Sequence, residues 1–277
     1  MNKELRLSPS SINTFLRSPR LFYYQYILGM KSPPNIHLYK GSFVHGILED
    51  LFSGGRYIDP KVYCTTRMND WNPPQAIIQH MKEGETEENH RNETAKILQV
   101  FATRLTEKIE MILLEGKARD KNHAWNLIKP KLREHKIFDT ERNVVGIIDS
   151  VETNFDDEVY VMDYKTSKLY KNTMSTEYVR QIAIYAYLFK KEFGKLPQYV
   201  GINYLRYGET YMIPLWIMDG KLGEMLEAQA IADIEYVRKN TVSTNIEDYP
   251  KGNDEFANQD IEYFEKKLAT SDSITLT

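Results

Sequence analysis

Two short apolar, β-branched segments constrain most strongly how this chain can fold: NVVGIIDSVET (143–153) and EVYVM (158–162). The residues between them, NFDD, have turn composition, so the sequence predicts a β-hairpin. If the turn centres on residue 156, Thr153 opposes Val159 and Asp149 opposes Asp163. Directly opposed side chains have Cβ atoms about 4.5–5.5 Å apart, where two like charges destabilise a sheet. A divalent cation between the two carboxylates would reverse that effect.

The second strand runs directly into DYKTSK (163–168). Side chains alternate between the faces of a strand, so Asp163 and Lys165 share one face. A surface salt bridge is one interpretation of this pair. The opposite face, however, is covered by Tyr160, Met162 and Tyr164, which indicates that the strand is no exposed edge. On the neighbouring strand, Gly146 permits close backbone approach.

The alternative interpretation is a metal site, because two hard carboxylates suit Mg²⁺ or Mn²⁺. Lys165 would then lie beside the ion, where it could hold a water or meet the charge that develops on a phosphate.

Composition narrows the class of protein. The chain has 277 residues, 42% of them apolar and 27% charged, which is typical of a folded protein of one or two domains. It contains no apolar run long enough for a membrane span and begins with no signal-peptide pattern, so we expect a cytoplasmic protein. The single cysteine, Cys64, excludes an internal disulfide and a four-cysteine iron–sulfur cluster.

Net charge and motifs exclude two further classes. The net charge of −3 argues against a general polyanion binder, although an enzyme could confine positive charge to one groove. The sequence has no G-x-x-x-x-G-K-[ST] stretch, which disfavours a nucleotide-driven motor.

Periodicity and capping residues predict the remaining elements. Strands are expected at 143–153, 158–165, 198–206 and 210–216, and residues 56–90 are expected to form an irregular surface excursion. Expected helices span 9–17, 19–28, 42–53, 91–115, 119–138, 176–193, 221–239 and 259–268. This order predicts one α/β domain over 1–277 with a helical insertion at about 55–137.

Five stretches, in this order, carry a family resemblance: LSPSSINTFLRSPRLFYYQYILG, GSFVHGILE, GIID, DYKTSK and QIAIY. They resemble the metal-dependent nucleases of the PD-(D/E)XK superfamily, in its RecB-like branch, which includes the CRISPR-associated RecB-like exonucleases. The resemblance covers about 1–53 and 140–206. It implies a restriction-endonuclease-like core in which helices flank a mixed central sheet.

The resemblance also implies roles for particular residues. His45, Asp149, Asp163 and the backbone carbonyl of Tyr164 would bind the metal, and Lys165 would be catalytic. On the helix that follows, Gln181 and Tyr185 would line the DNA path and support the lysine, although a buried core network also explains them. Glu49, one turn after His45, is either a hydrogen-bond partner of that histidine or a surface charge. Lys168 and neighbouring basic residues, interleaved with tyrosines, could contact DNA.

One departure from the family concerns its cysteines. Many relatives place a cysteine before the proline of the first motif and three more near the C-terminus, which together hold an iron–sulfur cluster. Ser18 stands at the first position here, and residues 240–277 contain no cysteine. We therefore expect no cluster and expect packing to join the terminal segments, through a helix that carries Ile261, Phe264 and Leu268.

The function expected from the resemblance is hydrolysis of DNA phosphodiester bonds by a Mg²⁺- or Mn²⁺-dependent nuclease. It would be an exonuclease on single-stranded DNA or DNA ends and would leave 5′-phosphate and 3′-hydroxyl products. The alternative is a nuclease-fold DNA-binding or assembly subunit, with little activity of its own, in DNA repair or CRISPR adaptation. In either case a helicase or a recombination or adaptation protein would be its partner.

Overall fold

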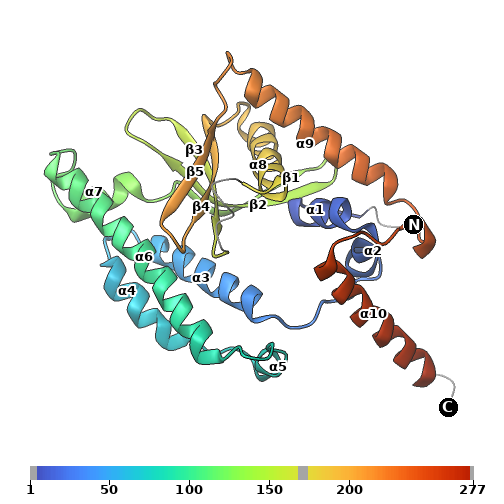
Figure 1. Ribbon diagram of the computed structural model, residues 1–277. Helices are drawn as coiled ribbons and strands as arrows, with labels where there is room; N and C mark the ends of the chain where they lie inside the picture. Colours follow the sequence, from blue (N-terminus) through green and yellow to red (C-terminus); the bar gives the residue numbers. More distant parts are fainter. Residues whose placement is uncertain (1–4, 168–173, 275–277) are drawn as a thin grey trace.

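A mixed five-stranded sheet lies at the centre of the molecule, with helices on both of its faces (Figure 1). The computed structural model describes residues 5–167 and 174–274. The strands follow the chain in space, and only β3 and β4 run parallel to each other. Their bounds are β1 (Leu132–Asp139), β2 (Val144–Thr153), β3 (Val159–Lys165), β4 (Tyr199–Tyr204) and β5 (Glu209–Pro214).

The hairpin of β2 and β3 has the predicted register. Thr153 pairs with Val159, and the ladder continues as far as Ser150 and Met162. Asp149 and Asp163 occupy the next step of this register, one position beyond the last backbone pair. The two carboxylates therefore lie where the strands stop pairing.

The parallel pair β3 and β4 is connected by α8 (Thr176–Phe193), which was predicted with the same bounds. Ser175 caps its first turn, and Gly194 ends it with a φ of 77°, in the left-handed region that glycine adopts readily. One side of α8 packs on the sheet and another on α9 (Lys221–Asn240), so its middle residues are buried. This helix brings Gln181 and Tyr185 to the sheet.

The two terminal segments of the chain pack against each other. The first helices, α1 (Pro9–Arg17) and α2 (Pro19–Phe22), lead into a π-helical turn (Tyr23–Ile27). The last elements are a 3₁₀ turn (Ile246–Asp248) and α10 (Glu255–Ile274). The rings of Tyr24 and Phe264 lie 5.4 Å apart, and Ile261 and Phe264 are fully buried, as expected. Leu268 is 38% exposed and takes no part in this core.

A second layer of helices covers the other face of the sheet (Figure 1). Its largest members are α3 (Ile36–Ser53) and α6 (Glu87–Leu114). Between them come α4 (Pro60–Arg67), a 3₁₀ turn (Met68–Asp70) and α5 (Gln75–Gln79), and α7 (Lys121–Ile128) follows. The expectation of an irregular excursion at 56–90 is therefore wrong, because Cys64, Met68 and Trp71 bury apolar area against this layer. Helix α3 also begins six residues earlier than expected, capped by Asn35.

The expected helix at 119–138 ends ten residues early. Helix α7 stops at Ile128, and Leu132–Asp139 form the edge strand β1. The charged run LREHK gives no apolar alternation, so its pairing with β2 and not its local pattern makes it a strand. Any helical insertion consequently ends before Leu132.

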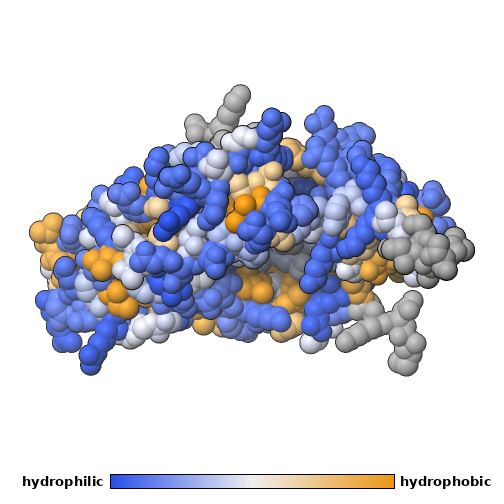
Figure 2. Space-filling view, turned by 90° about the horizontal axis from the view of Figure 1, so that it is seen from below, coloured by the Kyte–Doolittle hydropathy of each residue, from blue (hydrophilic) through white to orange (hydrophobic). Residues whose placement is uncertain are grey.

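Figure 2 shows the molecule from below the view of Figure 1. This face is mostly hydrophilic, with separate hydrophobic patches and a hollow near its middle. Within the described residues, no helix combines the length and apolar character needed to cross a membrane.

Candidate active site

Asp149 lies at a gap in the sheet. On the β1 side, Arg133 pairs with Ser150 and His135 pairs with Ile148, but the pair between them, Glu134 and Asp149, is skipped. Glu134 has a φ of 42°, in the left-handed region. On the β3 side, the ladder stops one residue short of Asp149. The side chain takes over the pairing, since Oδ2 of Asp149 accepts a hydrogen bond of 2.6 Å from the backbone N–H of Tyr164.

Helix α3 brings His45 to this gap. Nε2 of His45 lies 2.9 Å from the backbone oxygen of Tyr164. Nδ1 lies 3.6 Å from Oδ2 of Asp149 and 3.7 Å from Oε1 of Glu134. One imidazole and two carboxylates therefore converge from three elements, with one ligand atom of each within 4.8 Å of the others.

A second group of side chains surrounds Asp163 on β3. Oδ2 of Asp163 lies 2.6 Å from Nζ of Lys165. Nζ also donates to Oε1 of Gln181 at 3.0 Å, while Nε2 of Gln181 donates to Oδ1 of Asp163 at 2.9 Å. The same Nε2 lies 3.0 Å from the hydroxyl of Tyr185. Gln181 thus holds both the acid and the lysine of the DYKTSK strand in place.

Burial and like charge shift the pKa of the central carboxyl group. Burial is the larger cause and the neighbouring carboxylate of Asp163 the second; together they raise the pKa of Asp149 to about 7. Burial alone would lower the pKa of His45, but Glu134, Asp149 and Asp163 outweigh it and raise that pKa. Burial would likewise lower the pKa of Lys165, yet Asp163 raises it, so the lysine is an ammonium. The carboxyl groups of Glu134, Asp149 and Asp163 therefore lie close together, with His45 and Lys165 as the neighbouring basic groups.

These residues fit a divalent cation. Asp149 and Asp163 are 9% and 2% exposed, and buried carboxylates of like charge need a positive partner. Carboxylate oxygens suit Mg²⁺ and Mn²⁺, and an imidazole nitrogen is also a good ligand for first-row transition metals. The donor set of His45, Asp149 and Glu134 is therefore of the kind that holds such an ion.

The structure brings most of the expected site residues together: His45, Asp149, Asp163, Lys165, Gln181 and Tyr185. The carbonyl of Tyr164 also lies here, engaged by His45. Glu49 is exposed at the rim, and the structure records no hydrogen bond between it and His45. Lys168 lies outside the described residues.

Gly146 does permit close approach on β2, but to a helix and not to another strand. A Cβ atom at this position would lie 2.5 Å from Cδ1 of Leu188 and 3.3 Å from Cε1 of Tyr185, both on α8. The glycine therefore lets α8, with its site residues, pack directly on the sheet.

Sequence reasoning missed two residues of the site. The sequence pattern predicts a helix for the segment that contains Glu134, whereas the observed pairing of this segment with β2 sets Glu134 opposite Asp149. Tyr178 lies on the turn of α8 before Gln181, and Nζ of Lys165 lies 5.0 Å from the centre of its ring. Tyr178 precedes Gln181 by three residues, a spacing that places two side chains on the same face of a helix and could have indicated this position.

Comparison with known proteins identifies the class. The sequence model of the PD-(D/E)XK nuclease superfamily matches residues 6–267, nearly the whole chain. The chain belongs to this superfamily, whose members typically use divalent metals, and its sheet and flanking helices are a restriction-endonuclease-like α/β fold.

Two solved structures are distantly similar. One, titled "putative exonuclease" from Eubacterium rectale, is 13% identical, with a TM-score of 0.44 over 87% of this chain and 84% of that one. The other, titled SSO0001, is 14% identical, with a TM-score of 0.23 over 70% of this chain and 86% of that one. The search of curated proteins found no match.

Proposed function

We propose that this protein is a divalent-metal-dependent deoxyribonuclease that hydrolyses phosphodiester bonds. The observation that carries the proposal is the convergence of His45, Glu134 and Asp149 beside the Asp163–Lys165 pair. An N/O donor set next to a fixed ammonium can bind a cation and a phosphate together. Membership of a nuclease superfamily supports the same chemistry.

In this proposal His45, Glu134, Asp149 and Asp163 would hold Mg²⁺ or Mn²⁺, and the backbone carbonyl of Tyr164 would be a further ligand. When bound, a divalent cation supplies Lewis-acid polarisation of the phosphate and makes water a stronger nucleophile. Lys165 donates to a phosphate oxygen or to the attacking water and thereby stabilises charge that develops in the transition state. Gln181 positions Lys165, with Tyr185 behind it.

We further propose the finer features that the resemblance implies. The protein would belong to the RecB-like branch and act as an exonuclease on single-stranded DNA or DNA ends. Gln181, Tyr185 and Lys168 would lie along the DNA path, and Glu49 would be a surface charge. Residues 1–277 would form one nuclease domain in which the helices between about 55 and 131 are an insertion.

The test is a digestion assay with end-labelled single- and double-stranded DNA and with circular single-stranded DNA, each with Mn²⁺ or Mg²⁺. We expect linear DNA to be degraded, circular DNA to resist, and EDTA to stop the reaction. Asp149→Asn should abolish digestion, whereas the exposed Glu141→Gln on the β1–β2 turn should not.

The outcomes separate the proposal from its alternative. If the wild-type protein cuts none of these substrates but binds DNA, it is a nuclease-fold binding or assembly subunit. Cutting of circular DNA would instead keep the nuclease and replace the exonuclease by an endonuclease.

A further inference from the structure

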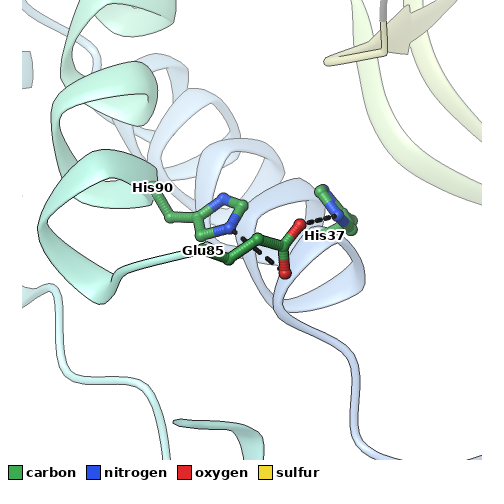
Figure 3. Close-up of side chains that lie close together, drawn as sticks. All are labelled: His37, Glu85 and His90. Atoms are coloured by element: carbon green, nitrogen blue, oxygen red, sulfur yellow. Dashed lines mark ion pairs between the residues drawn. The ribbon is translucent and has the colours of Figure 1, made fainter. Parts of the chain in front are cut away.

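We propose that His37, Glu85 and His90 form a second metal site, suited to Zn²⁺ or a similar first-row transition metal. The three side chains point toward one another, and Glu85 lies between the two histidines (Figure 3). They share no residue with the candidate active site. The nearest of its residues along α3 is His45, eight residues or about 12 Å further along the helix.

The three residues come from separate segments that the fold brings together. His37 lies in the first turn of α3, where its backbone N–H donates to the capping side chain of Asn35 at 2.7 Å. Glu85 lies between α5 and α6, in a turn where its carboxylate accepts from the backbone N–H of Lys82 at 3.1 Å. His90 lies in the first turn of α6. A bound ion would therefore tie the start of α3 to the start of α6.

The separations suit a small ion. Nε2 of His37 lies 3.4 Å from Oε1 of Glu85, and Nε2 of His90 lies 3.8 Å from Oε2. Tetrahedral Zn²⁺ with bonds of about 2.0–2.1 Å places its ligand atoms about 3.3 Å apart. Since one atom of each residue already lies within 4.8 Å of the others, small shifts of the three side chains would complete the site. Two imidazoles and a carboxylate leave the fourth position for water.

The imidazole of His90 is buried next to Glu85. The residue is 7% exposed, and its Nε2 faces the carboxylate of Glu85. The 3.8 Å between Nε2 and Glu85 is too long for an N–H···O hydrogen bond. Among the residues that the structure describes, its buried Nδ1 finds no hydrogen-bond partner. A buried imidazole nitrogen without a hydrogen-bond partner is costly, and an ion at Nε2 would give this ring a strong interaction.

Glu93 lies on the side of the His90 ring away from Glu85. Its Oε2 lies 3.9 Å from Nδ1 of His90, which is too long for a hydrogen bond, and its carboxylate accepts from Lys40 and Arg206. A rotation of this carboxylate toward Nδ1 would give the metal-bound ring the kind of partner that such histidines commonly have.

The test is calorimetric titration of metal-free protein with Zn²⁺. It uses the double variant Asp149→Asn/Asp163→Asn as background, so that ions at the candidate active site do not contribute. We expect one equivalent to bind, with the visible absorption of tetrahedral Co²⁺ when Co²⁺ replaces Zn²⁺. Adding His37→Ala or Glu85→Gln should lower the affinity at least about 100-fold. Adding His80→Ala, an exposed histidine at the end of α5, should leave binding unchanged.

Folding is checked separately, because a variant that unfolds would also lose the ion. The side chain of His37 is 54% exposed, so without metal His37→Ala should melt at the same temperature as the double-variant background. Zn²⁺ should raise the melting temperature of the background but not that of His37→Ala. The proposal fails if the background protein binds no Zn²⁺, or if His37→Ala and Glu85→Gln bind it as tightly as His80→Ala. Neither readout depends on nuclease activity, so failure of the proposed function would leave this test intact.

Discussion

Glu134 of β1 lies opposite Asp149 of β2 at the one step that the β1–β2 ladder skips between Arg133 and His135. Both carboxylates face Nδ1 of His45, at 3.7 and 3.6 Å. The gap in the ladder thus coincides with the point where the acidic groups converge.

The first prediction concerns Glu134. Glu134→Gln keeps the shape of the side chain but removes a negative charge from the proposed metal site, so we expect Mn²⁺ affinity and DNA cleavage to fall about 10- to 100-fold. Calorimetric titration with Mn²⁺ and the digestion assay measure the two effects. Glu141→Gln, on the exposed turn that follows β1, is the matched control. Equal activity of the two variants would remove Glu134 from the site.

The second prediction separates catalysis from metal binding at Lys165. Lys165→Ala removes the ammonium that lies 2.6 Å from Asp163, so we expect cleavage to fall about 10²–10³-fold. Mn²⁺ affinity should hold or rise, because Asp163 loses its competing cation. Lys191→Ala, an exposed lysine on α8, should behave as the wild type. A Lys165→Ala protein that cuts at the wild-type rate would contradict the proposed role.

The third prediction concerns the network through Gln181. Gln181→Leu removes the bond that Lys165 donates and the bond that Asp163 accepts at a buried place, which should cost about 1–3 kcal/mol of unfolding free energy. Tyr185→Phe removes one hydroxyl from the edge of the network and should cost less. Urea unfolding of both variants measures the difference. A smaller loss for Gln181→Leu than for Tyr185→Phe would show that Gln181 is not the centre of the network.

The fourth prediction tests the contact between Gly146 and α8. In Gly146→Ala the new Cβ would lie 2.5 Å from Cδ1 of Leu188, which is fully buried. We expect a loss of about 1–3 kcal/mol in unfolding free energy. Gly46→Ala on α3 meets nothing within 4 Å and should stabilise the helix by about 0.5–1 kcal/mol. Thermal unfolding of the pair checks both signs, and a neutral Gly146→Ala would refute the close packing.

The fifth prediction concerns Cys64. Burial raises the pKa of its thiol to about 12, and the residue is 2% exposed. Because the thiolate is the reactive form, iodoacetamide at pH 8 should modify native protein very slowly and denatured protein rapidly. Mass spectrometry follows the modification, and the Cys64→Ser variant supplies the background. Equal rates with and without denaturant would mean that α4 opens readily.

Much of the candidate site follows from local sequence. The turn NFDD and the two-residue period of the flanking strands fix the β2–β3 register, and that register alone sets Asp149 and Asp163 at the same step. Helix α8 was predicted with its observed bounds, with Gly194 marking its end, and Ser175 caps its start. These features depend on neighbouring residues, so a pattern in the chain is enough to reveal them.

Other features were decided only by tertiary structure. The segment that contains Glu134 has no strand pattern of its own, and only hydrogen bonding to β2 makes it β1. The meeting of His37, Glu85 and His90 likewise depends on how α3 and α6 pack. By itself the sequence determined which chemical groups the chain carries and their local conformation. The packing of distant segments decided which groups meet, because contacts between residues far apart in the chain leave no period in the sequence.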